Sequence, residues 1–205
     1  MILLQIIVSQ TNYFNFMQIT EEDKTLHVLF DNEVVRSLPA IIFKKHLKTL
    51  PSFQTKEQVL EFLDDLEKKL AKRRALYLLS KRQYFEGKLK ETLQKKGFSE
   101  ESTEYAVEEM LKYAYLNDDL GVEKFIEREM RQGKGPYMIL QKLKHKKAKV
   151  NAEIVFSIYT REKQLEMIQS LSEKSKKKGN QLIGYLERRG FSLEVILSVI
   201  KNLEQ

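Results

Sequence analysis

One string of eleven residues occurs twice in this chain, and it constrains the fold more than any other feature. Residues 89–99 are Leu-Lys-Glu-Thr-Leu-Gln-Lys-Lys-Gly-Phe-Ser, and residues 182–192 are Leu-Ile-Gly-Tyr-Leu-Glu-Arg-Arg-Gly-Phe-Ser. Two leucines, two basic residues, Gly, Phe and Ser coincide in order without a gap. A weaker copy begins at Ile139. Copies that begin at residues 89, 139 and 182 are spaced like stacked supersecondary units.

The repeated string predicts a helix, a tight corner and a second helix. Gly97 suits the first position beyond a helix, because glycine adopts the left-handed conformation without a side-chain penalty. Phe98 and Leu93 then stand where the hydrophobic contact of a Schellman cap forms. The two lysines before Gly97 lie at the negative end of the helix dipole. Ser99 is a typical N-cap for the helix that follows.

The other two copies predict related corners. Gly190 and Ser192 repeat the whole arrangement, so we expect a positive φ at Gly190 as well as at Gly97. In the middle copy, Lys147 occupies the glycine position and Ala148 the phenylalanine position. We therefore expect the middle corner to be looser or built differently.

Helical patterns dominate the chain from residue 55 onward. Glycine (8) and proline (3) are scarce among the 205 residues, which favours long helices. Beyond residue 71, apolar residues recur at spacings of three and four, and we find no strand pattern there. The predicted fold is mostly α, with tandem three-helix repeats forming an elongated array and a small β-containing (α+β) N-terminal unit.

The N-terminal segment carries the strand signals. Leu26, Val28 and Phe30 alternate with other residues, and the polar segment 21–24 and Asp31-Asn32 provide turns, which predicts a hairpin or a three-stranded ribbon. Residues 39–47 follow as a short helix with Pro39 in its first turn.

The extreme N-terminus and the unit boundaries are also predicted. Residues 1–8 are apolar but lack a basic flank and a small-residue cleavage site, so we interpret them as a strand and not a signal peptide. No apolar run is long enough to span a membrane. The expected units are a β-rich unit (1–54), a linker helix with the first repeat (55–116), the second repeat (117–160) and the third repeat (161–205).

Composition limits the chemistry. The absence of cysteine excludes disulfides and thiolate metal sites and fits a cytoplasmic protein. His27, His46 and His145 lie far apart, with no metal-ligand spacing. Residues 1–70 contain eight Lys/Arg and ten Asp/Glu, whereas the whole chain contains 36 and 29, so the positive charge belongs to the C-terminal two thirds. Such an excess attracts polyanions or an acidic protein face, or it only improves solubility.

No motif indicates catalysis. Gly133-Lys-Gly-Pro136 lacks the Gly-Lys-Ser/Thr ending of a P-loop and predicts a break between two helices. The pairs Asp64-Asp65 and Asp118-Asp119 have no companion His or Glu cluster. We interpret Asn117 and Asp118 as turn and N-cap residues. The sequence therefore predicts no enzyme, no cofactor and no metal.

Basic and aromatic residues leave two interpretations open. Basic runs at 68–74, 142–149 and 174–178 are each typical of a solvated face, but their recurrence in successive units could form a charged stripe. Tyrosines such as Tyr77 and Tyr115 could stack on nucleobases, although their helical spacing favours packing.

Several strings in the basic part resemble the RecX family. They are Ala-Leu-Tyr-Leu-Leu-Ser-Lys-Arg at 75–82, Lys-Gly-Phe at 96–98, Tyr-Leu-Asn-Asp at 115–118, Gly-Lys-Gly-Pro at 133–136 and Arg-Arg-Gly-Phe at 188–191. Their order and spacing are more specific than any single string, and residues 13–66 are similar to the variable β-containing N-terminus of some members. The sequence departs from the family pattern at Lys88, Ala114, residues 119–122 and residues 147–148.

The resemblance implies three tandem three-helix units that bind the groove of the RecA filament on single-stranded DNA. It also implies inhibition or tuning of strand exchange, ATP hydrolysis and co-protease activity, weak direct DNA binding, and no enzymatic activity. Apart from the resemblance, we expect the chain to be a monomer. The residues predicted to contact the partner or nucleic acid are Arg82, Lys95, Lys96, Arg128, Arg131, Lys146, Lys147, Arg188 and Arg189. The alternative is a helical DNA-binding protein that acts without RecA; an unrecognised enzyme is the weakest hypothesis.

Overall fold

The computed structural model describes residues 17–48 and 50–203. The chain divides into two compact units, one formed by Met1–Tyr77 and Lys90–Lys112 and the other by Leu78–Leu89 and Tyr113–Gln205. The strand expected over residues 1–8 lies outside the described residues, and the division into a β-rich unit and three repeats stays a prediction.

The N-terminal unit contains the expected three-stranded sheet. Its antiparallel strands, in spatial order, are β1 (Met17–Glu22), β2 (Thr25–Phe30) and β3 (Glu33–Pro39). Leu26, Val28 and Phe30 on β2 are buried, as the alternation predicted. Each hairpin turn has two residues with positive φ, Asp23-Lys24 in the first and Asp31-Asn32 in the second, which is typical of tight hairpin loops. The first turn is shorter than the polar segment 21–24, because Glu21 and Glu22 still pair with β2.

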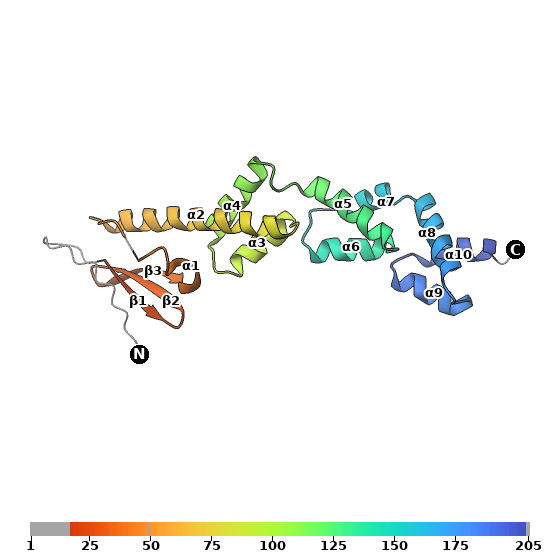
Figure 1. The fold of residues 1–205 in the computed structure, drawn as a ribbon, viewed down its shortest axis with the longest axis horizontal. Coiled ribbons are helices and arrows are strands. Elements are labelled where there is room, and N and C mark those ends of the chain that lie inside the picture. The colour runs from red at the N-terminus through yellow and green to blue at the C-terminus, as the bar shows by residue number, and fades with distance from the viewer. Residues whose placement is uncertain (1–16, 49, 204–205) are drawn as a thin grey trace. The chain divides into compact units, whose positions relative to one another are not determined.

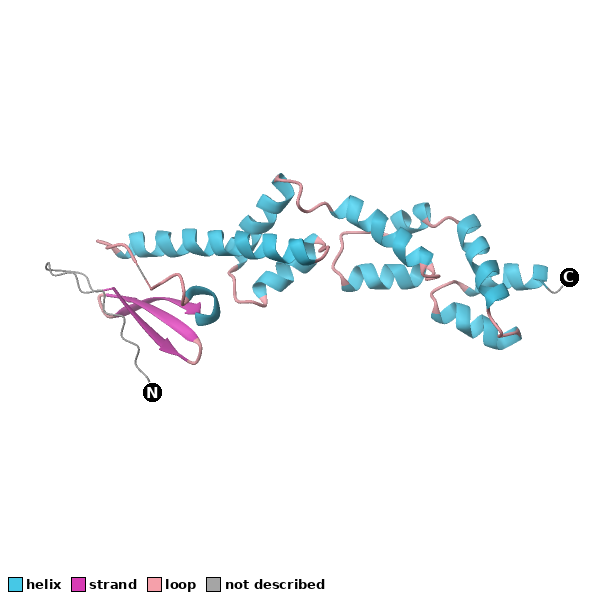
Figure 2. Ribbon diagram, in the orientation of Figure 1, coloured by secondary structure: helices cyan, strands magenta, loops and turns pink. Residues whose placement is uncertain are grey.

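Helices and the loops that join them make up the rest of the described chain (Figure 2), and no strand occurs between residues 75 and 203. They are α1 (Ala40–Phe43), α2 (Lys56–Lys81), α3 (Glu86–Gln94), α4 (Glu100–Lys112), α5 (Asp118–Arg131), α6 (Pro136–His145), α7 (Ala152–Ile158), α8 (Arg161–Lys174), α9 (Gly179–Arg188) and α10 (Leu193–Leu203). The predicted fold class, mostly helical with a small sheet, is confirmed. The helix expected over 39–47 is shorter, and Pro39 is its N-cap.

Helix α2 links the sheet to the helical part of its unit (Figure 1). The guanidinium of Arg36 on β3 pairs with Asp64 on α2. One turn further on, the buried carboxylate of Glu67 accepts a 2.6 Å hydrogen bond from the backbone N–H of Ser99, at the start of α4. Asp64 therefore pairs with the neighbouring strand while its side chain stays 40 % exposed.

Both complete copies of the repeated string form the predicted corner. Gly97 has a φ of 95° and Gly190 a φ of 92°. The N–H of Phe98 donates to the Leu93 carbonyl at 3.4 Å, and the N–H of Phe191 donates to the Leu186 carbonyl at 3.3 Å. In a Schellman cap, the N–H of the second residue beyond the helix donates to a carbonyl five residues earlier, as both of these hydrogen bonds do. Ser99 and Ser192 then cap α4 and α10, accepting from backbone N–H groups at 3.2 and 3.5 Å.

The middle corner is built in the same way, so the expectation of a looser or different corner is wrong. Lys147 has a φ of 54°, and the N–H of Ala148 donates to the Leu143 carbonyl at 3.1 Å. The motif consists of backbone hydrogen bonds, so a lysine can occupy the glycine position at a cost of about 1–2 kcal/mol for the left-handed conformation. Ala114, which stands where the RecX pattern has glycine, is also left-handed, with a φ of 55°.

Two of these corners dock on the start of an earlier helix in the same unit. The N–H of Gly135 donates to the Arg189 carbonyl at 2.7 Å, and the N–H of Tyr137 donates to the Gly190 carbonyl at 3.1 Å. A β-carbon at Gly87, in the first turn of α3, would lie 2.7 Å from the Lys147 carbonyl oxygen. The corner after α9 thus accepts hydrogen bonds from backbone N–H groups at the start of α6. The corner after α6 lies close against the first turn of α3.

Replacing Lys147 with glycine is expected to raise the free energy of unfolding by about 1 kcal/mol, because it removes the left-handed penalty. Ala114→Gly is expected to act in the same direction. Lys144→Gly is the matched control: this exposed residue is in the last turn of α6 and has no positive φ, so glycine is expected to lower the free energy of unfolding there, by up to about 1 kcal/mol. Urea denaturation of the full chain measures all three, and equal losses at Lys147 and Lys144 would contradict the left-handed assignment.

Candidate partner-binding surface

The nine predicted contact residues all lie at C-terminal ends of helices. Arg82 follows α2, Lys95 and Lys96 follow α3, Arg128 and Arg131 are in the last turn of α5, Lys146 and Lys147 follow α6, and Arg188 and Arg189 end α9. Cations there are stabilised by the negative end of the helix dipole, by about 0.3–1 kcal/mol each. The dipole therefore accounts for part of the pattern without any partner.

The three equivalent corners show which basic residues correspond. The Schellman bonds place Lys96, Lys146 and Arg189 at the same position, immediately before the left-handed residue. The position before it holds Lys95, His145 and Arg188. His145 was not among the predicted contacts, although counting back from Leu143 and Ala148 in the middle copy would have found it.

Arg189 has a structural role that the sequence did not indicate. Its Nη1 donates at 3.1 Å to the carbonyl oxygens of both Gln132 and Gly133, at the end of α5. Its guanidinium also lies 4.7 Å from the ring centroid of Tyr185. Arg189 thus closes the corner after α5, and its charge is only half-exposed.

Other predicted contacts keep exposed side chains. Arg82 lies over the ring of Tyr84, 4.5 Å from its centroid. Lys95 pairs with Glu91 one turn earlier at 2.6 Å and remains 70 % exposed. Lys96 and Arg188 are exposed as well. The charges at the ends of α3 and α9 are therefore accessible.

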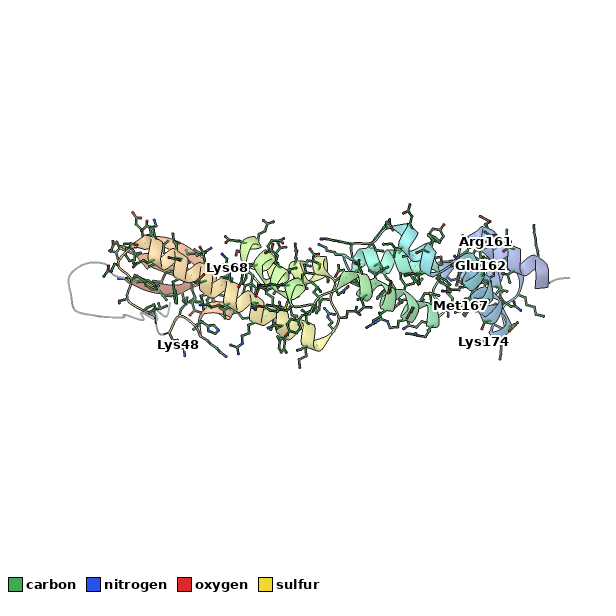
Figure 3. The ribbon with its side chains drawn as sticks, turned by 90° about the horizontal axis from the view of Figure 1, so that it is seen from above. Lys48, Lys68, Arg161, Glu162, Met167 and Lys174 are labelled. Carbon is green, nitrogen blue, oxygen red and sulfur yellow. The ribbon has the colours of Figure 1, made fainter. Side chains whose placement is uncertain are left out.

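The basic run at 68–74 differs because acidic side chains of α4 neutralise part of it. Lys68, labelled in Figure 3, pairs with Glu101 at 2.6 Å. Lys72 pairs with Glu109. This run is one of three candidates for a charged stripe, and the run at 142–149 is partly paired as well, through Lys142 with Glu129 and Lys149 with Glu86.

A basic hollow lies between α5 and α6. It has a volume of about 550 Å³ and is lined by Phe125, Arg128, Glu129, Gln141, Lys142, His145 and Lys146. The guanidinium of Arg128 lies 4.9 Å, and the ammonium of Lys146 5.7 Å, from the ring centroid of the buried Phe125. The structure thus brings together two of the nine predicted residues, from different helices, around one aromatic ring.

Glu129 is the one carboxylate in the lining of the hollow and is 5 % exposed. Lys142 donates to one of its oxygens, and Arg128 Nη2 lies 3.3 Å from the other. Burial alone would raise the pKa of the Glu129 carboxyl, but the hydrogen bonds and charges of Lys142 and Arg128 outweigh burial and lower the pKa. The carboxylate is therefore charged at neutral pH. Three cations, Arg128, Lys142 and Lys146, line the same hollow, so the lining keeps an excess of positive charge.

Four of the residues lining the hollow besides Phe125 were not predicted as contacts: Glu129, Gln141, Lys142 and His145. Lys142, His145 and Lys146 are spaced by three and four residues, which places them on one helix face. That spacing was visible in the sequence. What the sequence did not show is that this face of α6 meets the face of α5 that carries Arg128.

Asp118 of the second acidic pair has a structural partner, as Asp64 of the first has. Asn117 caps α5 by accepting from the N–H of Leu120 at 3.0 Å, as predicted. One oxygen of Asp118 accepts from the N–H of Glu86 at 2.9 Å, so this carboxylate caps α3. Burial raises the pKa of Asp118. Within residues 17–48 and 50–203, no cluster of three His, Cys, Asp or Glu residues could hold a metal ion, and no helix is long and apolar enough to cross a membrane.

Comparisons with known proteins identify the family of this chain. Residues 71–110 match the family described as RecX, first three-helix domain. The chain is 33% identical over 147 residues to the regulatory protein RecX of Caldanaerobacter subterraneus subsp. tengcongensis, which covers 69% of this chain and 75% of that protein. The chain belongs to the RecX family. The RecX protein of Legionella pneumophila is 31% identical over 140 residues, 63% of this chain and 92% of its own.

Solved RecX structures share the fold. The crystal structure of a regulatory protein RecX aligns with a TM-score of 0.61 at 16% identity, over 92% of this chain and all of that one. RecX from Lactobacillus salivarius aligns with a TM-score of 0.61 at 23% identity, over 67% of this chain and 97% of that one. At these identities the likeness to the two structures supports the helical-repeat fold alone.

Proposed function

We propose that this RecX-family protein binds the RecA filament on single-stranded DNA and inhibits its recombinase, ATPase and co-protease activities. Membership of a family of regulatory proteins carries the proposal, since the RecA partner is what the RecX resemblance implies. Accessible cations at the ends of α3 and α9, together with the basic hollow between α5 and α6, support a polyanionic nucleoprotein as partner. Successive helical repeats could each contact a successive part of a filament. Once one repeat is bound, the effective concentration of the others at the filament is raised.

The alternative is a helical DNA-binding protein that acts without RecA. The basic hollow is the observation that favours it, because a positively charged groove suits a nucleic acid backbone by itself. The two functions differ in whether RecA is required.

The expected result is that the protein inhibits the ATPase of RecA on single-stranded DNA, with an inhibition that weakens as salt rises. Binding is measured by fluorescence anisotropy with labelled DNA, bare and coated with RecA in the presence of a slowly hydrolysed ATP analogue. Tighter binding to the filament supports the proposal. Equal affinity for bare and coated DNA, with an unchanged ATPase, would favour the protein that acts without RecA.

A further inference from the structure

We propose that the hollow between α5 and α6 binds phosphodiester groups of single-stranded nucleic acid, and that Glu129 limits its affinity. This inference rests on the proposed function, in which single-stranded DNA is part of the partner. It assigns a site for that contact, formed by Arg128, Lys142 and Lys146 on two helices.

The cations of the hollow are held in place before a ligand arrives. The ring of Phe125 is 2 % exposed and lies beside both Arg128 and Lys146, at 4.9 and 5.7 Å from its centroid. Cation–π contacts at such distances stabilise a cation over a ring. Two cations that are already positioned lose less freedom on binding than free surface lysines do, which raises affinity for an anion between them.

The dimensions and lining of the hollow suit a nucleotide chain. A hollow of about 550 Å³ is in the range of pockets that hold ligands larger than a single carboxylate. Gln141 adds an amide that can both donate and accept, which suits a base or sugar beside a phosphate. Arg128 can donate two parallel hydrogen bonds to a phosphate.

Glu129 opposes an anion in the hollow. Its carboxylate is held by Lys142 and Arg128, the same cations that a phosphate would use. An incoming phosphate therefore meets a negative charge and competes with it for donors. Removing that charge while keeping the shape of the side chain should therefore strengthen binding. If Glu129 were only a structural ion-pair partner, its removal would not be expected to strengthen binding.

The first test measures direct binding of the full chain to a labelled single-stranded oligothymidylate without RecA. Arg128→Ala combined with Lys146→Ala is expected to weaken binding about tenfold at low salt, and to make the slope of log affinity against log salt shallower by about 0.7 for each cation removed. The matched control, Lys163→Ala with Lys201→Ala, removes two exposed charges from the same unit, outside both the hollow and the three basic runs, and should change affinity much less. Equal losses in both pairs would indicate a diffuse basic surface and overturn the proposal.

The second test is Glu129→Gln, which is expected to strengthen oligothymidylate binding about threefold. Thermal melting of each variant verifies that it is folded. Unchanged or weaker binding by folded Glu129→Gln would reject the limiting role of Glu129. Competition with polyglutamate identifies the ligand class: displacement of the oligonucleotide as efficient as by unlabelled oligothymidylate would point to an acidic protein surface and overturn the proposal.

The same variants separate this inference from the proposed function. If the wild type inhibits the RecA ATPase but the Arg128 and Lys146 variant binds oligothymidylate like the wild type, the hollow is not the site and the proposed function stands. If the variant loses DNA binding but the wild type has no effect on RecA, the site stands and the proposed function fails.

Discussion

Replacing Gly190 with alanine is expected to lower the free energy of unfolding by about 3 kcal/mol or more. Two effects add at this residue. A β-carbon is strained at a φ of 92°, by about 1 kcal/mol or more. The same β-carbon would lie 2.6 Å from the Met138 Cβ and closer still to the Met138 backbone nitrogen, an overpacking that typically costs about 1–3 kcal/mol. Urea denaturation followed by far-UV circular dichroism measures the loss.

Gly184→Ala is the matched control in α9, the helix that ends just before Gly190. Gly184 is in the interior of α9, and the nearest atom to its added β-carbon is the flexible end of Arg188, at 3.4 Å. Alanine there is expected to raise the free energy of unfolding by about 0.5–1 kcal/mol. Gly97→Ala should be intermediate, because the closest neighbour of its β-carbon, at 2.6 Å, is the ring of Pro39 and not backbone. A loss below about 1 kcal/mol at Gly190 would contradict the close docking of α9 on α6.

The corners could be predicted from the sequence because every interaction that defines them is local. Leu93, Gly97, Phe98 and Ser99 lie within seven consecutive residues, and their roles follow from the chemistry of helix ends. The sheet was predictable for the same reason, since its turn residues Asp31-Asn32 tolerate positive φ.

The error at Lys147 has a clear physical origin. We treated glycine as a requirement of the corner, whereas the hydrogen bonds come from the backbone and glycine only lowers their cost. Ala114 and Lys147 both depart from the expected glycine, and both keep the left-handed conformation. The residue type at a left-handed corner position therefore predicts the stability of the corner better than it predicts the backbone conformation.

The candidate site could be predicted only in part. The basic residues at helix ends were visible, but their partners come from other helices far along the chain. Arg189 reaches the carbonyls of Gln132 and Gly133, and Phe125 on α5 meets Lys146 from α6. Helix periodicity gives the face on which a residue lies, not the helix that this face meets. As a result, a structural arginine was counted among the contacts and the acidic member of the hollow, Glu129, was missed.

Reversing Lys95 and Lys96 to glutamate is expected to weaken inhibition of the RecA ATPase about tenfold or more at low salt. Both side chains are exposed, and the pair of Lys95 with Glu91 is a surface ion pair of small value. The cost to folding is the lost dipole interaction, about 0.3–1 kcal/mol for each charge, so the variant should remain folded. The effect should appear in filament binding and shrink as salt rises.

Arg188→Glu tests the equivalent corner of α9 without touching Arg189, whose reversal would also break its bonds to α5. Lys44→Glu with Lys45→Glu is the matched control for the lysine pair, because it changes the net charge equally at two exposed residues that were not predicted as contacts. Measuring ATPase inhibition and filament binding for all three folded variants at two salt concentrations ranks the surfaces. Wild-type inhibition by both corner variants, without salt dependence, would reject the charged corners as the contact. Exposed aromatic residues such as Tyr77 and Tyr115 would then be the better candidates, because an aromatic ring can stack on a base without using a charge.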